Sequence, residues 1–146
     1  MPFFKQPGRI IITCNKRLSP FLQHEIEELG FAIIRTFSTG VELTGTLNDC
    51  IRLNLNLRCA SQVLFSLQSF PCNSPAQLYD EASKIQWETI FVKDGYFSVT
   101  GTVDHPTINN SLFANVKLKD AIVDRFRMKV NERPNSGPYL QSTVIH

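Results

Sequence analysis

The sequence predicts an α+β protein, because segments with the alternating pattern of β-strands are interspersed with segments that repeat every three to four residues, as helices do. The chain has 146 residues, of which 42% are hydrophobic and 19% charged. This composition is typical of one folded domain, or of two small domains that share a sheet or an interface. The longest helical pattern extends over residues 108–133 and is the largest element that the sequence predicts.

The first 46 residues have the pattern β-α-β-β. Runs rich in β-branched residues predict strands over 9–14, 31–37 and 41–46. Between the first two strands, Ser19-Pro20 provides an N-cap followed by proline, and Gly30 provides a C-terminal stop. A helix is therefore expected between them.

A second helix and a fourth strand follow. The helix is expected to begin at Thr46 or Asn48 and to turn Leu47, Ile51 and Leu55 toward the core, because these residues recur at helical spacing. Cys50 and Leu57 are further candidates for the inward face. The strand is predicted over 63–70, where apolar residues alternate with polar ones.

The rest of the chain supplies a third helix, a fifth strand and the beginning of a last strand. Ser74-Pro75 repeats the capping device and starts the helix, and the fifth strand is predicted over 97–103. Thr143-Val144-Ile145 has a strand pattern that stops with the sequence. We therefore expect the 146 residues to be part of a longer protein.

The long helix has one apolar arc and one charged arc at about 100° per residue. Lys119 falls in the middle of the apolar arc, where an ammonium group must either reach solvent at the edge of the fold or meet an anion. The apolar arc contains Val116, Ile122, Val123, Phe126 and Val130. The charged arc contains Lys117, Asp120, Asp124 and Arg127.

No catalytic or metal-binding motif is present in the sequence. The dipeptide Asp104-His105 precedes a proline in a loop and has no evident nucleophile as a partner. The four cysteines contain no C-x-x-C pair, so they are expected to be reduced and structural rather than metal ligands. No apolar run is long enough for a membrane span and no hydrophobic signal segment precedes the first strand, which favours a cytoplasmic protein.

Positive charge is concentrated in and after the long helix. The net charge of the whole chain is only +2, so global charge decides little. Two interpretations of the helix remain open: a nucleic-acid surface, or a solvated face with ordinary pairs such as Lys117 with Asp120. The basic residues are Lys117, Lys119, Arg125, Arg127, Lys129 and Arg133, and the donors Asn109, Asn110 and Ser111 precede them.

Several collinear motifs resemble a known family. The most specific is Lys117-Leu118-Lys119-Asp120-Ala121-Ile122-Val123-Asp124, which is followed by Arg133-Pro134 and preceded by Arg58-Cys59-Ala60-Ser61. Together they resemble the amino-terminal region of bacterial THUMP-containing class I RNA methyltransferases, the guanine-N2 methylases of large-subunit ribosomal RNA. The resemblance implies a ferredoxin-like domain over residues 1–46 and a THUMP domain over 47–146, incomplete at its C-terminus.

The resemblance also implies a function. A THUMP domain would bind RNA, here large-subunit ribosomal RNA, and position it for an S-adenosylmethionine-dependent methyltransferase domain elsewhere in the same protein. This stretch would then hold no cofactor, no metal and no catalytic residue of its own. Taken together, the charge pattern and the resemblance give these candidate RNA-binding residues: Lys119, Lys117, Asn110, Ser111, Arg58, Arg127 and Arg133.

Two other functions remain as alternatives. The chain could be a ferredoxin-like protein-interaction or regulatory module without RNA binding, or a stand-alone enzyme. The motifs also depart from the family at Asn109 and Gln62, where the family carries arginine, so this chain has fewer positive charges available for RNA.

Overall fold

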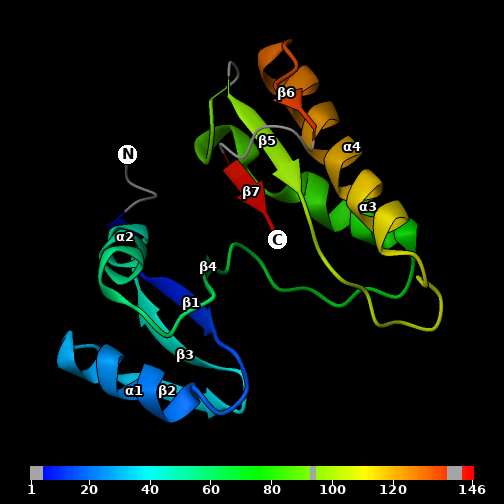
Figure 1. Ribbon diagram of the computed structural model, residues 1–146. Coiled ribbons are helices and arrows are strands. Elements are labelled where there is room, and N and C mark those ends of the chain that lie inside the picture. Colours follow the sequence, from blue (N-terminus) through cyan, green and yellow to red (C-terminus); the bar gives the residue numbers. More distant parts are fainter. Residues whose placement is uncertain (1–4, 93–94, 138–142) are drawn as a thin grey trace. The chain divides into compact units, whose positions relative to one another are not determined.

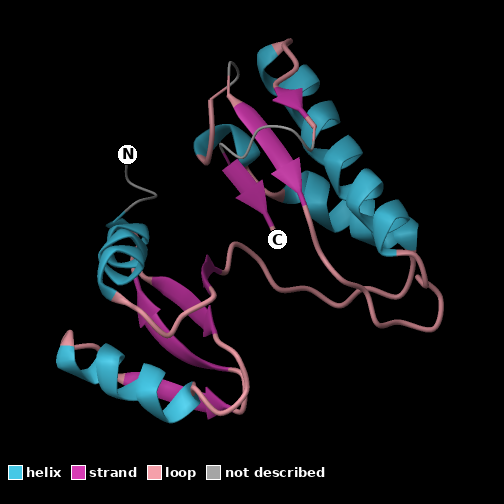
Figure 2. Cartoon of the chain, viewed as in Figure 1, coloured by secondary structure: helices cyan, strands magenta, loops and turns pink. Residues whose placement is uncertain are grey.

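The computed structural model describes residues 5–92, 95–137 and 143–146. The chain forms two compact units, Met1–Ser69 and Phe70–His146, each with its own sheet and its own helices (Figure 1). The α+β class that the sequence predicts is confirmed (Figure 2). In the part of the chain that the structure describes, no helix combines the length and the apolar character that crossing a membrane requires.

The first unit is a four-stranded antiparallel sheet with two helices. Its strands are arranged in the order β2-β3-β1-β4, which together with the two helices is the β-α-β-β-α-β topology of a ferredoxin-like domain. The elements are β1 (Gly8–Thr13), α1 (Ser19–Glu28), β2 (Ile33–Phe37), β3 (Gly40–Gly45), α2 (Leu47–Asn56) and β4 (Gln62–Phe65).

Both helices of the first unit contribute to one hydrophobic core. Alternate residues of the central strands, such as Ile10 and Leu43, are fully buried, because successive side chains of a strand point to opposite faces. Ile26 of α1 and Leu53 of α2 pack into the same cluster. Since one cluster receives residues from both helices, α1 and α2 cover the same face of the sheet.

Helix α2 and strand β4 belong to the first unit, although the sequence analysis placed the domain boundary after Thr46. Strand β4 pairs with the free edge of β1, with Ile12 opposite Val63. Helix α2 buries Cys50 and Leu53 in the core that β1 and β3 line. A linear pattern predicts that a strand exists, but only the folded chain shows which sheet it joins.

The inward face of α2 differs from the predicted one. Ile51 is 54% exposed and Leu55 80% exposed, whereas Leu53, which was not predicted, is buried; Cys50 is buried as expected. This ten-residue helix has apolar residues on more than one side, so spacing alone could not identify the side that meets the sheet. The helix start was predicted correctly: Thr46 and Asp49 form a reciprocal capping box.

The second unit is a small parallel sheet with two long helices. The strands are arranged in the order β6-β5-β7, with β5 parallel to both neighbours. Strands β4 and β5 are both shorter than the predicted ranges 63–70 and 97–103. The elements are α3 (Pro75–Lys84), the short 3-10 helix η2 (Trp87–Thr89), β5 (Tyr96–Val99), α4 (Ser111–Val130), β6 (Asn135–Ser136) and β7 (Thr143–Ile145).

Aromatic side chains form the centre of the second core. The ring of Phe91 lies 5.2 Å from that of Phe97 on β5 and 5.1 Å from that of Phe126 on α4, measured between centroids. These distances are in the range of favourable aromatic pairs. Buried Trp87 donates its indole N–H to the carbonyl of Ala82 at 2.8 Å, which ties η2 to the last turn of α3.

Candidate nucleic-acid interface

Helix α4 carries most of the candidate residues, and its two ends are well capped. The Asn110 side-chain oxygen accepts the backbone N–H groups of Leu112 at 3.0 Å and Phe113 at 3.3 Å. Asn131 ends the helix in the left-handed conformation, with φ of 54°. Arg127 and Lys129 lie in the last turn, where positive charge is favoured by the helix dipole.

The buried arc of α4 is shorter than the sequence predicts. Ile122, Val123 and Phe126 are buried as expected, but Val116 is 44% and Val130 is 40% exposed. A twenty-residue helix is about 30 Å long, whereas a four-residue strand such as β5 extends over only about 13 Å. The sheet therefore covers only part of the length of the helix.

One edge of α4 packs against α3 and uses its charges internally. Arg125 donates to both carboxylate oxygens of Glu88, at 2.7 and 2.6 Å, and to the carbonyl of Ser83 at 2.9 Å. Its side chain is only 14% exposed. The Tyr79 hydroxyl donates to Asp124 at 2.5 Å. Arg125, which the sequence analysis counted in the basic run, is therefore a structural residue.

These contacts shift the pKa values of two acids. The hydrogen bonds from Arg125 hold the pKa of the Glu88 carboxyl below its usual value, because they favour the charged form. The hydrogen bond to Asp124 raises the pKa of Tyr79, because loss of the hydroxyl proton would place two negative charges side by side.

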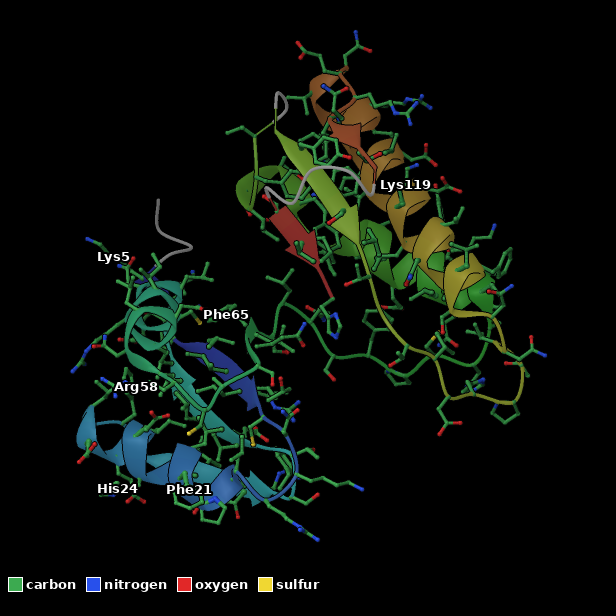
Figure 3. All side chains as sticks on the ribbon, viewed as in Figure 1. Lys5, Phe21, His24, Arg58, Phe65 and Lys119 are labelled. Carbon is green, nitrogen blue, oxygen red and sulfur yellow. The ribbon has the colours of Figure 1, made fainter. Side chains whose placement is uncertain are left out.

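Lys119 lies in the buried arc of α4, as the sequence predicts, and it is half-buried (Figure 3). Its ammonium group forms no hydrogen bond or ion pair with any residue that the structure describes. A cation beside Ile122 and Phe126 with no internal partner must direct its charge toward solvent or a ligand. Of the two outcomes expected for Lys119, an internal ion pair is thus not found.

Asn115 shares this property and was not among the predicted site residues. It lies one turn before Lys119 on the same arc, is half-buried, and makes no side-chain hydrogen bond to any described residue. Its amide therefore keeps its hydrogen-bonding capacity for solvent or a ligand. The sequence contained a signal for it, because Asn115 is a second polar residue at an inward-facing helical position.

The other candidates on α4 are exposed or weakly paired. The Lys117 ammonium lies 5.7 Å from the centroid of the Phe113 ring, a cation–π contact in place of the expected pair with Asp120. Arg127 is 3.9 Å from the Asp124 carboxylate, at the limit of an ion pair. Arg133 is exposed after the end of the helix.

Asn110 and Ser111 have structural contacts of their own. Asn110 caps the helix through its side-chain oxygen, which leaves its amide N–H groups for other partners. The Ser111 hydroxyl accepts the backbone N–H of Val103 at 3.1 Å and so holds the loop that leads into α4. Both residues therefore fix the start of the helix.

Arg58 lies in the first unit, apart in sequence from the other candidates. It follows α2, its side chain is exposed, and its backbone N–H donates to the Glu25 carboxylate at 3.2 Å. The N–H of Cys59 donates to the same carboxylate at 3.1 Å. Glu25 therefore fixes the backbone of this loop while the guanidinium group of Arg58 reaches solvent.

The second unit has no net charge, since it contains eight basic and eight acidic residues. Long-range attraction of a polyanion by this unit is therefore weak, and any affinity for RNA depends on local arrangement. Arg125 is committed to its internal pair with Glu88, so a local arrangement for RNA would depend on the other cations of α4.

The described residues offer neither a metal site nor a nucleotide-sized hollow. Among them, no group of three or more His, Cys, Asp or Glu side chains is arranged to hold a metal ion. A hollow of about 50 Å³ lies between the end of α2 and β4, far below the volume of a typical ligand pocket. It is lined by Asn54, Leu57, Ala60, Ser61, Gln62 and Val63.

Two family models match the chain. The RlmL ferredoxin-like domain matches residues 9–64, which end within β4, and the THUMP domain matches residues 72–136. A relative from Psychromonas ingrahamii named ribosomal RNA large subunit methyltransferase K/L is 40% identical over 85% of this chain. A relative of the same name from Syntrophotalea carbinolica is 33% identical over 88% of it. The chain spans only 17% and 18% of the lengths of these two relatives.

Solved structures share the fold. A Listeria monocytogenes protein described as a "predicted N6-adenine-specific DNA methylase" has a TM-score of 0.77 at 24% identity, over 86% of this chain and 33% of its own. SMU.472, solved in complex with SAH, has a TM-score of 0.80 at 20% identity, over 92% of this chain and 37% of its own. TrmN from Thermus thermophilus has a TM-score of 0.61 at 17% identity, over 95% and 41%. Residues 9–64 of this chain therefore belong to the family of the RlmL ferredoxin-like domain, and residues 72–136 belong to the family of the THUMP domain.

Proposed function

We propose that this chain is an RNA-binding module that positions ribosomal RNA for an S-adenosylmethionine-dependent methyltransferase domain of the same protein. The THUMP match and the names of the relatives support the class of partner. The observation that carries the proposal is Lys119, a half-buried cation in an apolar arc with no partner among the described residues. A hydrophobic residue would pack better there, so the lysine has a use outside the core.

The surface around Lys119 favours a weak complex that depends on salt. Lys117, Arg127 and Arg133 are further candidate cations of this region that reach solvent. A complex with about three phosphate contacts loses roughly twentyfold in affinity between 50 and 200 mM salt. Most of the RNA affinity of the whole protein would then come from its other parts.

The chemistry of methyl transfer belongs outside this chain. The relatives are more than five times longer than the region matched here, so substrate guanine, cofactor and catalytic residues would lie in the remaining part. S-adenosylmethionine would supply the methyl group in that part of the protein. An enzyme that acts on ribosomal RNA would work in the cytoplasm.

The first unit offers one observation in favour of protein interaction. Ile51 and Leu55 form an exposed apolar pair one turn apart on α2, which is unusual for an isolated surface helix. A protein-interaction role for this unit is the second candidate function. It is compatible with RNA binding by the second unit.

Fluorescence anisotropy with a labelled ribosomal RNA fragment tests the proposal. We expect the 146-residue chain to bind at 25 mM salt and to lose affinity as salt increases. Lys119→Met, which keeps the apolar stem, is expected to weaken binding about tenfold, whereas the control Lys129→Met on the same helix changes it less than twofold. Absence of salt-dependent binding by the wild-type chain would refute the RNA-binding role.

A further inference from the structure

The inner face of α4 brings two polar residues to one end of the small parallel sheet. Asn115 and Lys119 are one turn apart, so their side chains lie on the same side of the helix. Together with the buried residues Ile122 and Phe126, they form one stripe along the helix. Asn115 and Lys119 are the polar half of this stripe and lie toward the start of the helix, whereas Phe126 of the aromatic core lies at the other end.

The orientation of α4 places this polar half at the carboxyl ends of the strands. The Phe126 ring stacks on Phe91, which contacts Phe97 in the first half of β5. In Figure 1, the arrowhead of β5 points toward the end where α4 begins. The start of the helix therefore extends past the ends of β5 and β7.

Direct geometry confirms that Asn115 faces this end of the sheet. A Cβ atom placed on Gly101 would lie 3.4 Å from the side-chain oxygen of Asn115. The preceding residue, Thr100, donates its backbone N–H to the carbonyl of Ile145 at 2.8 Å. Its hydroxyl lies 3.1 Å from Nδ1 of His146. Polar groups from α4, β5 and β7 thus gather at one edge.

We propose that these residues form a phosphate-binding site, which we name the strand-end site. It consists of Asn115, Lys119, Thr100, Gly101 and His146. The inference rests on the proposed function, and it assigns the phosphodiester backbone of RNA as the ligand. The carboxyl ends of parallel strands are a common place for ligands, because strand backbones end there with side chains and loops free to converge.

Four of the five members have distinct roles in the proposed site, and His146 contacts the Thr100 hydroxyl. The Lys119 ammonium supplies the charge, and the Asn115 amide and the Thr100 hydroxyl supply directed hydrogen bonds to phosphate oxygens. Gly101 has no side chain, so a ligand can approach the backbone closely. None of the four side chains of the site carries a carboxylate that would repel an anion.

The site explains why Asn115 and Lys119 occur together. If Asn115 and Lys119 were unrelated surface residues, removal of Asn115 would leave RNA affinity unchanged. As one site they act on the same phosphate, so loss of either weakens binding. A hydrogen bond to a charged phosphate oxygen is among the stronger hydrogen bonds in proteins, so we expect Asn115→Ala to weaken RNA binding about tenfold.

The experiment combines NMR with anisotropy on the whole 146-residue chain. Titration of the ¹⁵N-labelled wild type with a ribosomal RNA fragment is expected to shift the amide signals of Thr100, Gly101 and the Asn115 side chain. Asn115→Ala and Lys119→Met are each expected to reduce affinity about tenfold, with the double variant close to either single one. The matched control Lys129→Met removes a cation from the same helix outside the site.

Separate outcomes distinguish the site from the proposed function. If the wild type binds RNA and Asn115→Ala binds equally well, the strand-end site is wrong and RNA binding stands. A second titration with inorganic phosphate separates the two sources of the ligand. Shifts at Thr100 and Gly101 with phosphate but not with RNA would overturn RNA as the ligand. Absence of these shifts with both ligands would overturn the site itself.

Discussion

Two cations on helix α4, Arg125 and Lys119, have opposite environments although they are six residues apart in the same basic run. Arg125 is enclosed between α3 and η2, where its guanidinium group binds Glu88 and the carbonyl of Ser83. Lys119 faces the other side and binds no described residue. The comparison shows that a basic run identifies a helix of interest, but the neighbouring elements decide which of its charges are available to a ligand.

The same division applies to the acidic residues of the second unit. Glu88 from η2 and Asp124 from α4 are paired at the α3 edge. Their partners are therefore fixed within the fold, and they do not oppose an anion at the Lys119 edge. The four predictions below test this division between a structural edge and a binding edge.

Arg125→Met is expected to have the largest effect on stability. It leaves the Glu88 carboxylate and the carbonyl of Ser83 without their donor at a partly buried position. We expect the free energy of unfolding to fall by about 2 kcal/mol, measured by urea denaturation, and RNA affinity to change less than twofold. If Arg125→Met instead keeps its stability and loses RNA affinity, the edge of α4 that packs against α3 is a binding edge and not a structural one.

The contribution of the Arg125–Glu88 pair is expected to depend on pH. The pKa of Glu88 is lowered in the fold from the ordinary value of 4.5. A carboxyl group with a lowered pKa stabilises the fold above its unfolded pKa and loses this contribution as the pH falls through the folded value. The difference in melting temperature between the wild type and Arg125→Met should therefore be full at pH 7 and shrink below pH 4.5. A difference in melting temperature that is the same at pH 7 and at pH 3 would contradict this expected pH dependence.

Tyr79→Phe is expected to have a smaller effect on the same edge. The variant removes only the hydrogen bond to Asp124, which corresponds to about 1 kcal/mol of unfolding free energy. Because the pKa of Tyr79 is raised above 10 in the fold, the wild type should lose this advantage as the pH rises through that folded value. Urea denaturation at pH 8 and at pH 11 measures both effects, and equal stability of the two proteins at pH 8 would show that the bond contributes nothing.

Lys119→Leu is expected to have the smallest effect on stability and the opposite sign. A leucine in the apolar arc buries additional surface beside Ile122 and Phe126, so the free energy of unfolding should rise by about 0.5 kcal/mol. RNA affinity should fall at the same time, as for Lys119→Met. Thermal unfolding and anisotropy on the same samples test whether stability rises while RNA affinity falls. A Lys119→Leu variant that is less stable than the wild type would mean that the lysine is part of the core.

Much of the secondary structure followed from local patterns. The capping signals at Thr46 and Ser74-Pro75 each cap a helix in the structure. The helix predicted at Ser19-Pro20 is also present, but its N-cap is Leu18 and no side chain caps it, so the predicted role of Ser19 as N-cap is wrong. The inward position of Lys119 also followed from helical spacing alone. In contrast, Ile51 and Leu55 were assigned to the wrong side of α2, because a short helix with scattered apolar residues has no single preferred arc.

The sequence by itself determined the order of the helices and strands, which helix is the longest, and that a lysine lies among its apolar residues. These features depend on caps and periodicity within a few residues of each other. Only the tertiary structure decided that β4 joins β1, that Arg125 is held by Glu88, and that Asn115 meets Gly101. The partners of β4 and Arg125 are far apart in sequence. Gly101 and Asn115 are 14 positions apart, and they meet only because the segment after β5 returns the chain to α4. Packing and hydrogen-bond geometry select such partners, and no local pattern contains that information.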